Sequence, residues 1–480
     1  MQRGVRSSST APPARSPERF QGRSPMHSPT PPDAIVSRVD PLPPRSAWFL
    51  VGALSLASMV AYVDRQILAL LFGPIKADLG LSDTEVSLLM GLAFVACYSL
   101  FGLFSGWLTD RYSRKGLISI GVIFWSAATA ACGAANSFVQ LFVARMAVGV
   151  GESTLSPAAM SSLTDAFPRE KLARAMSVYT AAAFVGMGLA MVLGGLGIGI
   201  ATRMIDADLP LIGHLRPWQL TFVLVGATGA LVVIPILFTR EPNRSRAVLD
   251  VETGENDKGP PFVGFLKANK ASFGLLWAGY SLNAMAGVAT MSWTPTYFIR
   301  SFGLTAPEIG LIYGLIISVF GLIGVLSGPV VLAWITRKGF RDGYVLFPLL
   351  CLAAGAIPSV FAFSTDIMWL ALALISIKQV IMTLPMPIMA MSMQIIAPSE
   401  LRGRLSAIYL FMGNILAAAI GPVTVAIFTD YVFADEARLG SSIIANTVLM
   451  VPLAATCLWF AIKPYRASLA DADAGFVRSY

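Results

Sequence analysis

Residues 81–92, Leu81-Ser-Asp-Thr-Glu85-Val-Ser-Leu-Leu-Met-Gly91-Leu92, return 223 positions later as Leu304-Thr-Ala-Pro-Glu308-Ile-Gly-Leu-Ile-Tyr-Gly314-Leu315. Arg114-Lys115-Gly116 recurs as Arg337-Lys338-Gly339 at the same offset. Further along, Pro168, Glu170 and Arg174 match Pro398, Glu400 and Arg404 at an offset of 230. Three matches in one order indicate that the chain consists of two homologous halves.

The composition places both halves in a membrane. The chain is 55% hydrophobic and 13% charged, whereas soluble proteins are about 25% charged. An apolar run of about 20 residues crosses the bilayer as a helix. On that criterion the sequence has roughly twelve such runs. Their centres lie near Met59, Phe94, Phe124, Val150, Met187, Val225, Ala286, Phe320, Leu352, Val380, Leu416 and Met450. We therefore expect an all-α polytopic membrane protein with twelve transmembrane helices in two homologous six-helix halves.

The polar stretches set the expected boundaries. Residues 1–46 are rich in Pro, Ser and Arg and lack an apolar signal-peptide core, which predicts a disordered cytoplasmic tail. Residues 47–239 form the N-terminal half, 240–270 a cytoplasmic loop, 271–463 the C-terminal half and 464–480 a second tail. Repeated halves of this kind are typical of transporters that bind substrate between them near the bilayer midplane.

The positive charges predict the orientation. The formal net charge is +8, which alone also fits a nucleic-acid-binding protein. However, 27 of the 35 Lys and Arg fall in the tails and the loops of one side, against five on the other side. Cytoplasmic loops carry such an excess. We therefore expect both termini in the cytoplasm, insertion in the inner or cell membrane, and no nucleic-acid partner.

Cysteine and histidine give no sign of a cofactor. Cys97, Cys132, Cys351 and Cys457 lie in apolar runs without a CxxC neighbour, which favours buried small side chains over disulfides or metal ligands. The two histidines, His27 and His214, are too few for a zinc site. We expect no metal, no cofactor and no catalytic residues.

A loop after the second predicted helix carries a family signature. It reads Gly106-Trp-Leu108-Thr-Asp110-Arg111-Tyr-Ser-Arg114-Lys115 and resembles the G-x-L-x-D-R-x-x-R-K loop of the major facilitator superfamily. The resemblance implies that Gly106, Asp110, Arg111, Arg114 and Lys115 latch the cytoplasmic side closed. A carboxylate held by Arg and by a helix N-terminus would break when the halves rock. The alternative is a positively charged loop with no latch function.

Three ionisable residues, Asp64, Arg145 and Glu152, lie within apolar runs, where a charge costs at least ~2.5–3.5 kcal/mol. Arg145 and Glu152 are separated by about 10.5 Å along one helix face, so each is expected to pair with another helix. Asp64 and Arg65 point about 100° apart. We expect Asp64 to face the central cavity and approach Arg145, and Arg65 to serve the cavity mouth or a helix contact.

A buried carboxylate whose cation can move away is a proton-coupling device. Asp64 and Arg145 are therefore a proposed proton-coupling pair, to which the family resemblance described next adds Glu152. The alternative is a static ion pair that fixes helix packing. The predicted substrate contacts are Arg145, Arg65, Lys378, Gln379, Asn283 and Asn414. Lys378 could instead extend to the membrane interface.

Three stretches together resemble spinster-like members of this superfamily. They are Tyr62-Val63-Asp64-Arg65, then Arg145 through Gly149-Val-Gly151-Glu152-Ser, and Pro157 through Asp165-Ala-Phe167-Pro168. The resemblance implies transport of sphingolipids or lysophospholipids, with Asp64 and Glu152 as protonation sites and Arg145 between proton and substrate.

We therefore expect a proton-coupled secondary transporter of an amphiphilic or anionic substrate that works by rocker-switch alternating access. Its partners would be protons, the substrate and membrane lipids, and a monomer would suffice. The alternatives are an uncoupled facilitator, an organic-anion carrier of the same superfamily, and a membrane sensor or integral membrane enzyme.

Overall fold

The computed structural model describes residues 42–203, 208–209, 213–243, 262–337, 343–398 and 401–473. The predicted tails and the middle of the loop between the halves, residues 1–41, 244–261 and 474–480, lie outside this range. The boundaries expected at 46, 239, 270 and 463 stay predictions. The helices that approach them begin at Pro44, end at Phe238, begin at Phe262 and continue to Asp473.

Six apolar stretches make up the first half, and in three of them two helices follow one another. They are α1 (Pro44–Leu79), α2 (Asp83–Met90) with α3 (Leu92–Arg111), α4 (Arg114–Cys132), α5 (Phe138–Glu152) with α6 (Leu155–Ala166), α7 (Arg169–Arg203), and α8 (Pro217–Leu231) with α9 (Val233–Phe238). Between α7 and α8 two short strands, β1 (Asp208–Leu209) and β2 (Gly213–His214), pair antiparallel.

The second half repeats this order. A short helix, α10 (Phe262–Ala268), precedes α11 (Lys270–Phe302), α12 (Ala306–Arg337), α13 (Gly343–Ala362), α14 (Met368–Thr383) with α15 (Met386–Ile395), and α16 (Arg402–Ile415). After α16 come η1 (Leu416–Ile420), α17 (Gly421–Ile427), η2 (Phe428–Phe433), η3 (Glu436–Arg438) and α18 (Leu439–Asp473). Of these, η1 and η2 are π-helical and η3 is a 3₁₀ turn.

The sequence repeat produces the same local structure twice. Both α1 and α11 end at a glycine with positive φ, Gly80 at 63° and Gly303 at 67°, which glycine adopts without steric cost. Beyond each glycine a hydroxyl residue and a glutamate form a capping pair. Ser82 N–H donates to Glu85 at 2.9 Å, and Thr305 N–H donates to Glu308 at 2.8 Å. The matching motifs are therefore helix starts.

Eleven of the helical stretches among the described residues are long and apolar enough to cross a membrane. The predicted twelfth, centred near Ala286, is α11, which has 33 residues but is less apolar than the other eleven. At 1.5 Å per residue its length exceeds the ~30 Å bilayer core. Its hydropathy is lowered by buried polar residues, among them Ser281, Thr290, Thr294 and Thr296. The prediction of an all-α fold with twelve spans is therefore confirmed.

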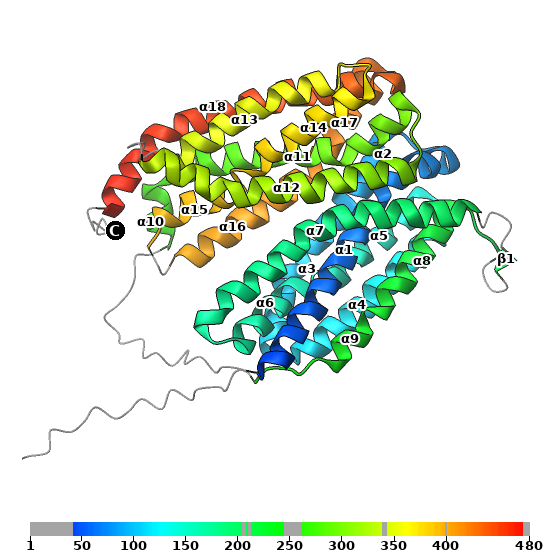
Figure 1. Cartoon of the computed structure of the whole chain (residues 1–480), viewed down its shortest axis with the longest axis horizontal. Helices are drawn as coiled ribbons and strands as arrows, with labels where there is room; N and C mark the ends of the chain where they lie inside the picture. The colour runs from blue at the N-terminus through cyan, green and yellow to red at the C-terminus, as the bar shows by residue number, and fades with distance from the viewer. Residues whose placement is uncertain are drawn as a thin grey trace, which may run out of the picture. The chain divides into compact units, whose positions relative to one another are not determined.

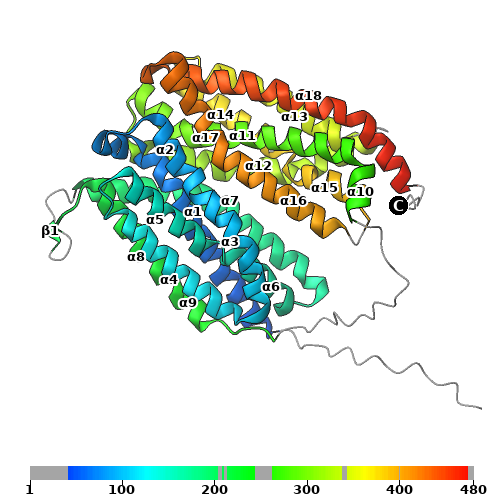
Figure 2. The ribbon, with the colours of Figure 1, turned by 180° about the vertical axis from the view of Figure 1, so that it is seen from behind.

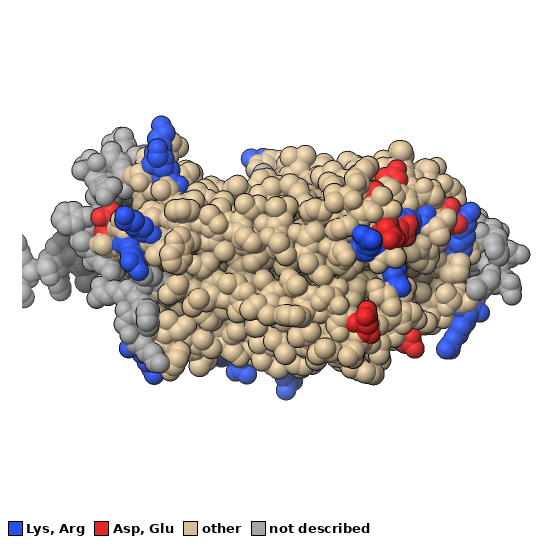
Figure 3. Space-filling model, turned by 90° about the horizontal axis from the view of Figure 1, so that it is seen from above, with Lys and Arg blue, Asp and Glu red and all other residues tan. Residues whose placement is uncertain are grey.

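The surface has the polarity of a membrane protein. Figure 3 shows Lys, Arg, Asp and Glu gathered mainly toward the two ends, with a broad uncharged band between them. Large apolar side chains are exposed on the spans, among them Leu100, Trp369 and Val330 at 67%, 70% and 70%. A soluble protein would rarely expose so many, whereas lipid covers them. The chain is an integral membrane protein.

The two halves touch along α7 and α12 and where α2 meets α17, which lie side by side in both ribbon views (Figures 1 and 2). The close approach of α7 to α12 depends on glycines, which have no side chain. A Cβ on Gly188 would lie 2.2 Å from the Gly314 carbonyl oxygen, and one on Gly314 would lie 2.5 Å from that of Gly188. A Cβ on Gly91 would lie 2.0 Å from the Ala418 carbonyl oxygen. The halves can pack this closely only because glycines line the contact.

We name the two ends of the helix bundle by their residues. The Asp83 end holds Leu79, Asp83, Arg300 and Glu436, and the Arg114 end holds Arg111, Arg114 and Asp165.

Candidate functional site

Four buried or partly buried charges meet between α1 and α5 in the first half. Asp64 and Arg65 come from α1, and Arg145 and Glu152 come from α5. Glu152 is the last residue of α5, directly before the break that separates α5 from α6. Asp64 and Arg145 are 0% exposed and Glu152 is 1% exposed. Charges this deep in a membrane half require close partners.

The direct ion pair of the cluster joins Arg65 to Glu152. The Arg65 Nε and Nη2 atoms both lie 2.7 Å from Glu152 Oε2. The guanidinium also lies over the rings of Tyr62, Phe94 and Tyr98, at 5.3, 4.8 and 4.7 Å from their centroids. Aromatic faces attract a cation, so Arg65 is held from two directions. Its side chain is still 28% exposed, whereas that of Glu152 is 0% exposed.

The other two charges are less well matched. Arg145 Nη1 donates to the backbone carbonyl oxygen of Asp64 at 3.0 Å. Neither carboxylate oxygen of Asp64 has a hydrogen-bond partner, and Arg145 Nε and Nη2 have none either. The hydroxyl of Thr129, a neighbour of Asp64, also lacks a hydrogen-bond partner. An unpaired buried carboxyl is costly as an anion, and a proton removes that cost.

The structure corrects the orientation expected for α1. Asp64 was expected to face the central cavity, but it is fully buried inside the first half, and the neighbouring Arg65 is the partly exposed residue. Arg145 does approach Asp64, through the backbone carbonyl. Adjacent helical residues point about 100° apart, so the rotation of α1 about its own axis sets the directions of both the Asp64 and the Arg65 side chains. The pairing of Arg65 with Glu152 was not predicted.

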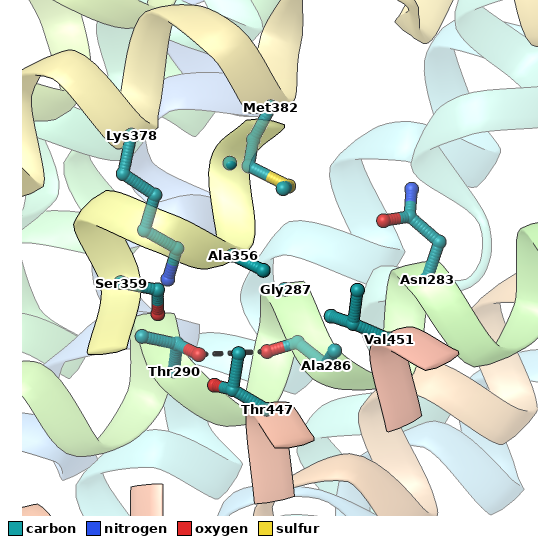
Figure 4. Close-up of a pocket in the computed structure, with 11 residues that line it drawn as sticks. Asn283, Ala286, Gly287, Thr290, Ala356, Ser359, Lys378, Met382, Thr447 and Val451 are labelled. Carbon is teal, nitrogen blue, oxygen red and sulfur yellow. Dashed lines mark hydrogen bonds between the residues drawn. The ribbon is translucent and has the colours of Figure 1, made fainter. Parts of the chain in front are cut away.

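In the second half a pocket lies among α11, α13, α14 and α18. It is a small pocket that is partly open to solvent. Lys378 of α14 extends into it, Ser359 of α13 lines it too, and Asn283 appears on the other side of the view (Figure 4). Thr290 faces it too, but its hydroxyl donates to the Ala286 carbonyl oxygen at 2.8 Å. The structure thus brings Lys378 and Asn283 to one pocket.

The remaining predicted substrate residues do not join this pocket. Gln379 points toward α12, where its Nε2 would lie 3.3 Å from a Cβ on Gly321. The side chain of Asn414 lies outside the described residues. Arg65 and Arg145 belong to the cluster in the first half. The predicted contacts therefore divide between two places, one in each half.

The loop expected to act as a latch makes its described contacts within the first half. Arg114, which is 1% exposed, binds Asp165 of α6, and its backbone N–H donates to Glu241 at 2.7 Å. Lys115 Nζ donates to the Thr239 carbonyl oxygen at 3.0 Å. These contacts tie α4 to α6 and to the end of α9.

Two further members of the predicted latch lie at the helix surface. Arg111 stacks over the Trp107 ring at 4.2 Å, and a Cβ on Gly106 would meet nothing within 4 Å. The side chain of Asp110 lies outside the described part of the chain. The latch stays a prediction.

At the Asp83 end, charged residues link the two halves. Asp83 binds Lys76 and Arg300, and both cations also reach Glu436, at 2.6 and 3.0 Å. Nearby, the Thr84 backbone N–H and hydroxyl donate to Asp430 at 2.7 and 2.6 Å. Sequence reasoning missed these residues because they lie at helix ends, where charges are ordinary. The motif Leu81 to Glu85 was the available signal.

Comparison with known proteins agrees with this architecture. The chain is 27% identical over 437 residues to the "MFS-type efflux pump" of Mycolicibacterium smegmatis, a match that covers 89% of this chain and 95% of that protein. It is 24% identical over 318 residues to "Protein spinster" of Drosophila melanogaster, covering 64% of this chain and 49% of that protein.

The fold is also that of a solved transporter structure. A bacterial homolog of the human lysosomal transporter Spinster, crystallised in an inward-facing and unoccupied conformation, superposes with a TM-score of 0.77 at 23% identity. The match covers 90% of this chain and 99% of that chain. Finally, the family model of the Major Facilitator Superfamily matches residues 54–422. With its two six-helix halves and spinster-like resemblance, the chain belongs to the Major Facilitator Superfamily.

Proposed function

We propose that the chain is a proton-coupled secondary transporter of an organic anion, with anionic amphiphiles such as lysophospholipids or sphingoid phosphates as the leading substrate class. The observation that carries the proposal is the cluster of Asp64, Arg65, Arg145 and Glu152. It holds one direct carboxylate–guanidinium pair and one carboxyl without a hydrogen-bond partner. Ionisable groups placed this way inside a membrane protein commonly bind protons or substrate.

Arg65 is the group through which proton and substrate would communicate. Its guanidinium binds Glu152 and is the more exposed partner of that pair. A proton on Glu152 removes the negative charge and frees the guanidinium to bind an anion, while the rings of Phe94 and Tyr98 keep it in place. Proton binding and anion binding then favour each other, because both act on one cation. Asp64, beside Arg145, provides a second place for a proton.

The contacts between the halves support alternating access. The ion pairs of Lys76, Asp83, Arg300 and Glu436 hold the halves together at the Asp83 end. The distribution of Lys and Arg favours the Arg114 end as the cytoplasmic end, with both termini inside. The structure is then a state closed toward the outside. Rocking of the halves would break these pairs and open the Asp83 end.

The test uses purified protein in proteoliposomes, with a labelled lysophospholipid or sphingoid phosphate added outside the vesicles. Wild-type uptake should rise when a pH gradient is imposed. Asp64→Asn and Glu152→Gln should keep exchange of labelled for unlabelled substrate but lose the response to the gradient. Asp366→Asn, which neutralises an exposed carboxylate outside the cluster, should behave as wild type.

Each alternative predicts a different result in this assay. Wild-type uptake that ignores the gradient would indicate an uncoupled facilitator. Transport of short organic acids in place of lipids would indicate an organic-anion carrier. If neither exchange nor uptake occurs with any of these substrates, transport itself is refuted and a sensor becomes the better explanation.

A further inference from the structure

We infer that the pocket around Lys378 is a second anion site, which binds a carboxylate or a similar small oxyanion in the place where the first half carries its own carboxylate, Asp64. The two halves correspond position by position, and this correspondence identifies the site. Only the identification of this anion with the substrate's head group rests on the proposed function.

The helix ends give the correspondence between the halves. Asp64 stands sixteen residues before Gly80, and Gly287 stands sixteen residues before Gly303, the matching end of α11. In the third span of each half, Thr129 stands three residues before the last residue of α4, and Ser359 three before the last residue of α13. Gly287 is thus the counterpart of Asp64, and Ser359 is the counterpart of Thr129.

The substitution of glycine for the acid leaves space. A Cβ built on Gly287 would meet nothing within 4 Å. Gly287 and Ser359 both line the pocket. In the first half the corresponding place holds the Asp64 carboxylate, next to Thr129 and Arg145. The second half therefore has an opening where the first half has an anionic side chain.

In the described part of the chain, the pocket contains a positively charged residue, Lys378, but no acidic residue to pair with it. Lys378 lies one helical turn beyond Ile375, the counterpart of Arg145 at the offset of 230 that also relates Pro157 to Pro387. No Asp or Glu lines the pocket, and among the described residues no ion pair or hydrogen bond of Lys378 is seen. The Lys378 side chain is only partly buried, and an ammonium without a partner attracts an anion.

The pocket also holds a hydrogen-bond donor. The Ser359 hydroxyl is buried, with the residue 1% exposed, and has no hydrogen-bond partner. Ser359 lines the same pocket as Lys378 (Figure 4). One carboxylate can accept from both groups, one bond to each oxygen. Beyond them Ala356, Met382 and Val451 give the pocket an apolar wall, which suits the carbon chain that follows a carboxylate.

The test measures binding of sodium acetate to the purified full chain by titration calorimetry, at constant ionic strength. Wild type should bind acetate saturably. Lys378→Met, which keeps the length of the side chain and removes the charge, should weaken binding at least about tenfold, as expected for the loss of a charged hydrogen bond. Lys463→Met serves as the matched control at an exposed lysine of α18 outside the pocket and should bind as wild type.

A second pair of variants tests the correspondence with Asp64. Gly287→Asp places a carboxylate in the open space and should abolish acetate binding, because the protein then supplies the anion. It should also raise the unfolding midpoint relative to Gly287→Asn, and Lys378→Met should remove that gain. Gly287→Ala adds only a methyl group and should still bind acetate.

Two results would overturn the inference. One is equal acetate binding by wild type and Lys378→Met. The other is an equal unfolding midpoint for Gly287→Asp and Gly287→Asn when Lys378 is present. Loss of transport coupling in the proteoliposome assay would leave both measurements unchanged, so the two proposals can fail separately. Alkanoates of increasing length then identify the source of the anion. Affinity that rises with length indicates a substrate head group, and constant affinity indicates a free small anion.

Discussion

Arg300 of the second half donates to both carboxylate oxygens of Asp83 in the first half, at 2.9 and 3.0 Å. Asp83 is 0% exposed and stands at the first position of α2, where the helix dipole also favours an acid. Bidentate pairs of this kind are strong and fix geometry. Lys76 binds the same carboxylate. The link between the halves at this end is therefore built around one buried acid.

Replacing Arg300 should open the Asp83 end more often. Arg300→Met leaves Lys76 as the one cation bound to Asp83 in the described residues. We therefore expect the closed state to become less stable relative to the open state by about 1–3 kcal/mol. Ser87→Cys, introduced into a background without the native cysteines, reports on opening because Ser87 is 0% exposed in the closed state. Its labelling by a membrane-impermeant maleimide should accelerate about tenfold or more.

The control for this measurement is Arg438→Met. Arg438 lies at the same end, but its side chain is 63% exposed and its pair with Asp435 is long, at 3.7 Å. Exposed pairs contribute little, so labelling of Ser87→Cys should stay at the wild-type rate. Equal acceleration by both substitutions would show that general charge, and not the Asp83 pair, holds this end closed.

The glycine contact between α7 and α12 should act on the same equilibrium. Gly314→Ala places a Cβ 2.5 Å from the Gly188 carbonyl oxygen, which a packed interface cannot accept without separation of the helices. The variant should favour the state open at the Asp83 end and increase the same labelling. Gly274→Ala, at a helical glycine with nothing within 4 Å, is the matched control. Unchanged labelling in Gly314→Ala would mean that α7 and α12 stay in contact throughout the transport cycle.

The sequence predicts the fold well because its signals are local and repeated. Apolar runs long enough to span a bilayer require helices, since no water is present to satisfy the backbone. The repeat from Leu81 to Leu92 marks helix starts that the structure builds with the same caps in both halves. Of the twelve spans, α11 is the least apolar. Two of its polar residues, Asn283 and Thr290, line the pocket, so part of this deviation points to a site.

The site was predictable in part. Charges within apolar runs identify Asp64, Arg145 and Glu152, but the sequence does not give the rotation of α1 about its axis. That rotation, set by packing against the other helices, directs Arg65 to Glu152 and buries Asp64. The pocket of Lys378 was hidden for another reason. Its main feature is a missing side chain at Gly287, and only the comparison of the two halves reveals it.

The Arg65–Glu152 pair should show an asymmetry between its partners. Arg65→Met leaves the fully buried Glu152 carboxylate without its cation. This substitution should lower the free energy of unfolding by about 3–5 kcal/mol. Glu152→Gln leaves a guanidinium that is 28% exposed and stacked on aromatic rings, so it should cost less. The double variant should be more stable than Arg65→Met alone. Thermal unfolding in detergent measures all three, and strictly additive losses would mean that the two side chains do not interact.

Substitutions of Arg114 and Arg111 test whether the signature loop stabilises the first half or forms a latch between the halves. Arg114 is buried against Asp165 and Glu241 within the first half, so Arg114→Ala should destabilise the protein by roughly 1–3 kcal/mol. Arg111→Ala removes an exposed cation above Trp107 and should cost no more than about 1 kcal/mol. Unfolding midpoints and substrate exchange are measured on both variants.

A latch between the halves predicts the opposite pattern for Arg114. The midpoint of Arg114→Ala would then match that of Arg111→Ala, while its exchange rate would change, because the lost contact would form only when the Arg114 end closes. A lower midpoint together with restored exchange at reduced temperature would show that Arg114 acts by joining α4 to α6. The same substitution thus decides between a contact that holds one half together and a contact that forms between two.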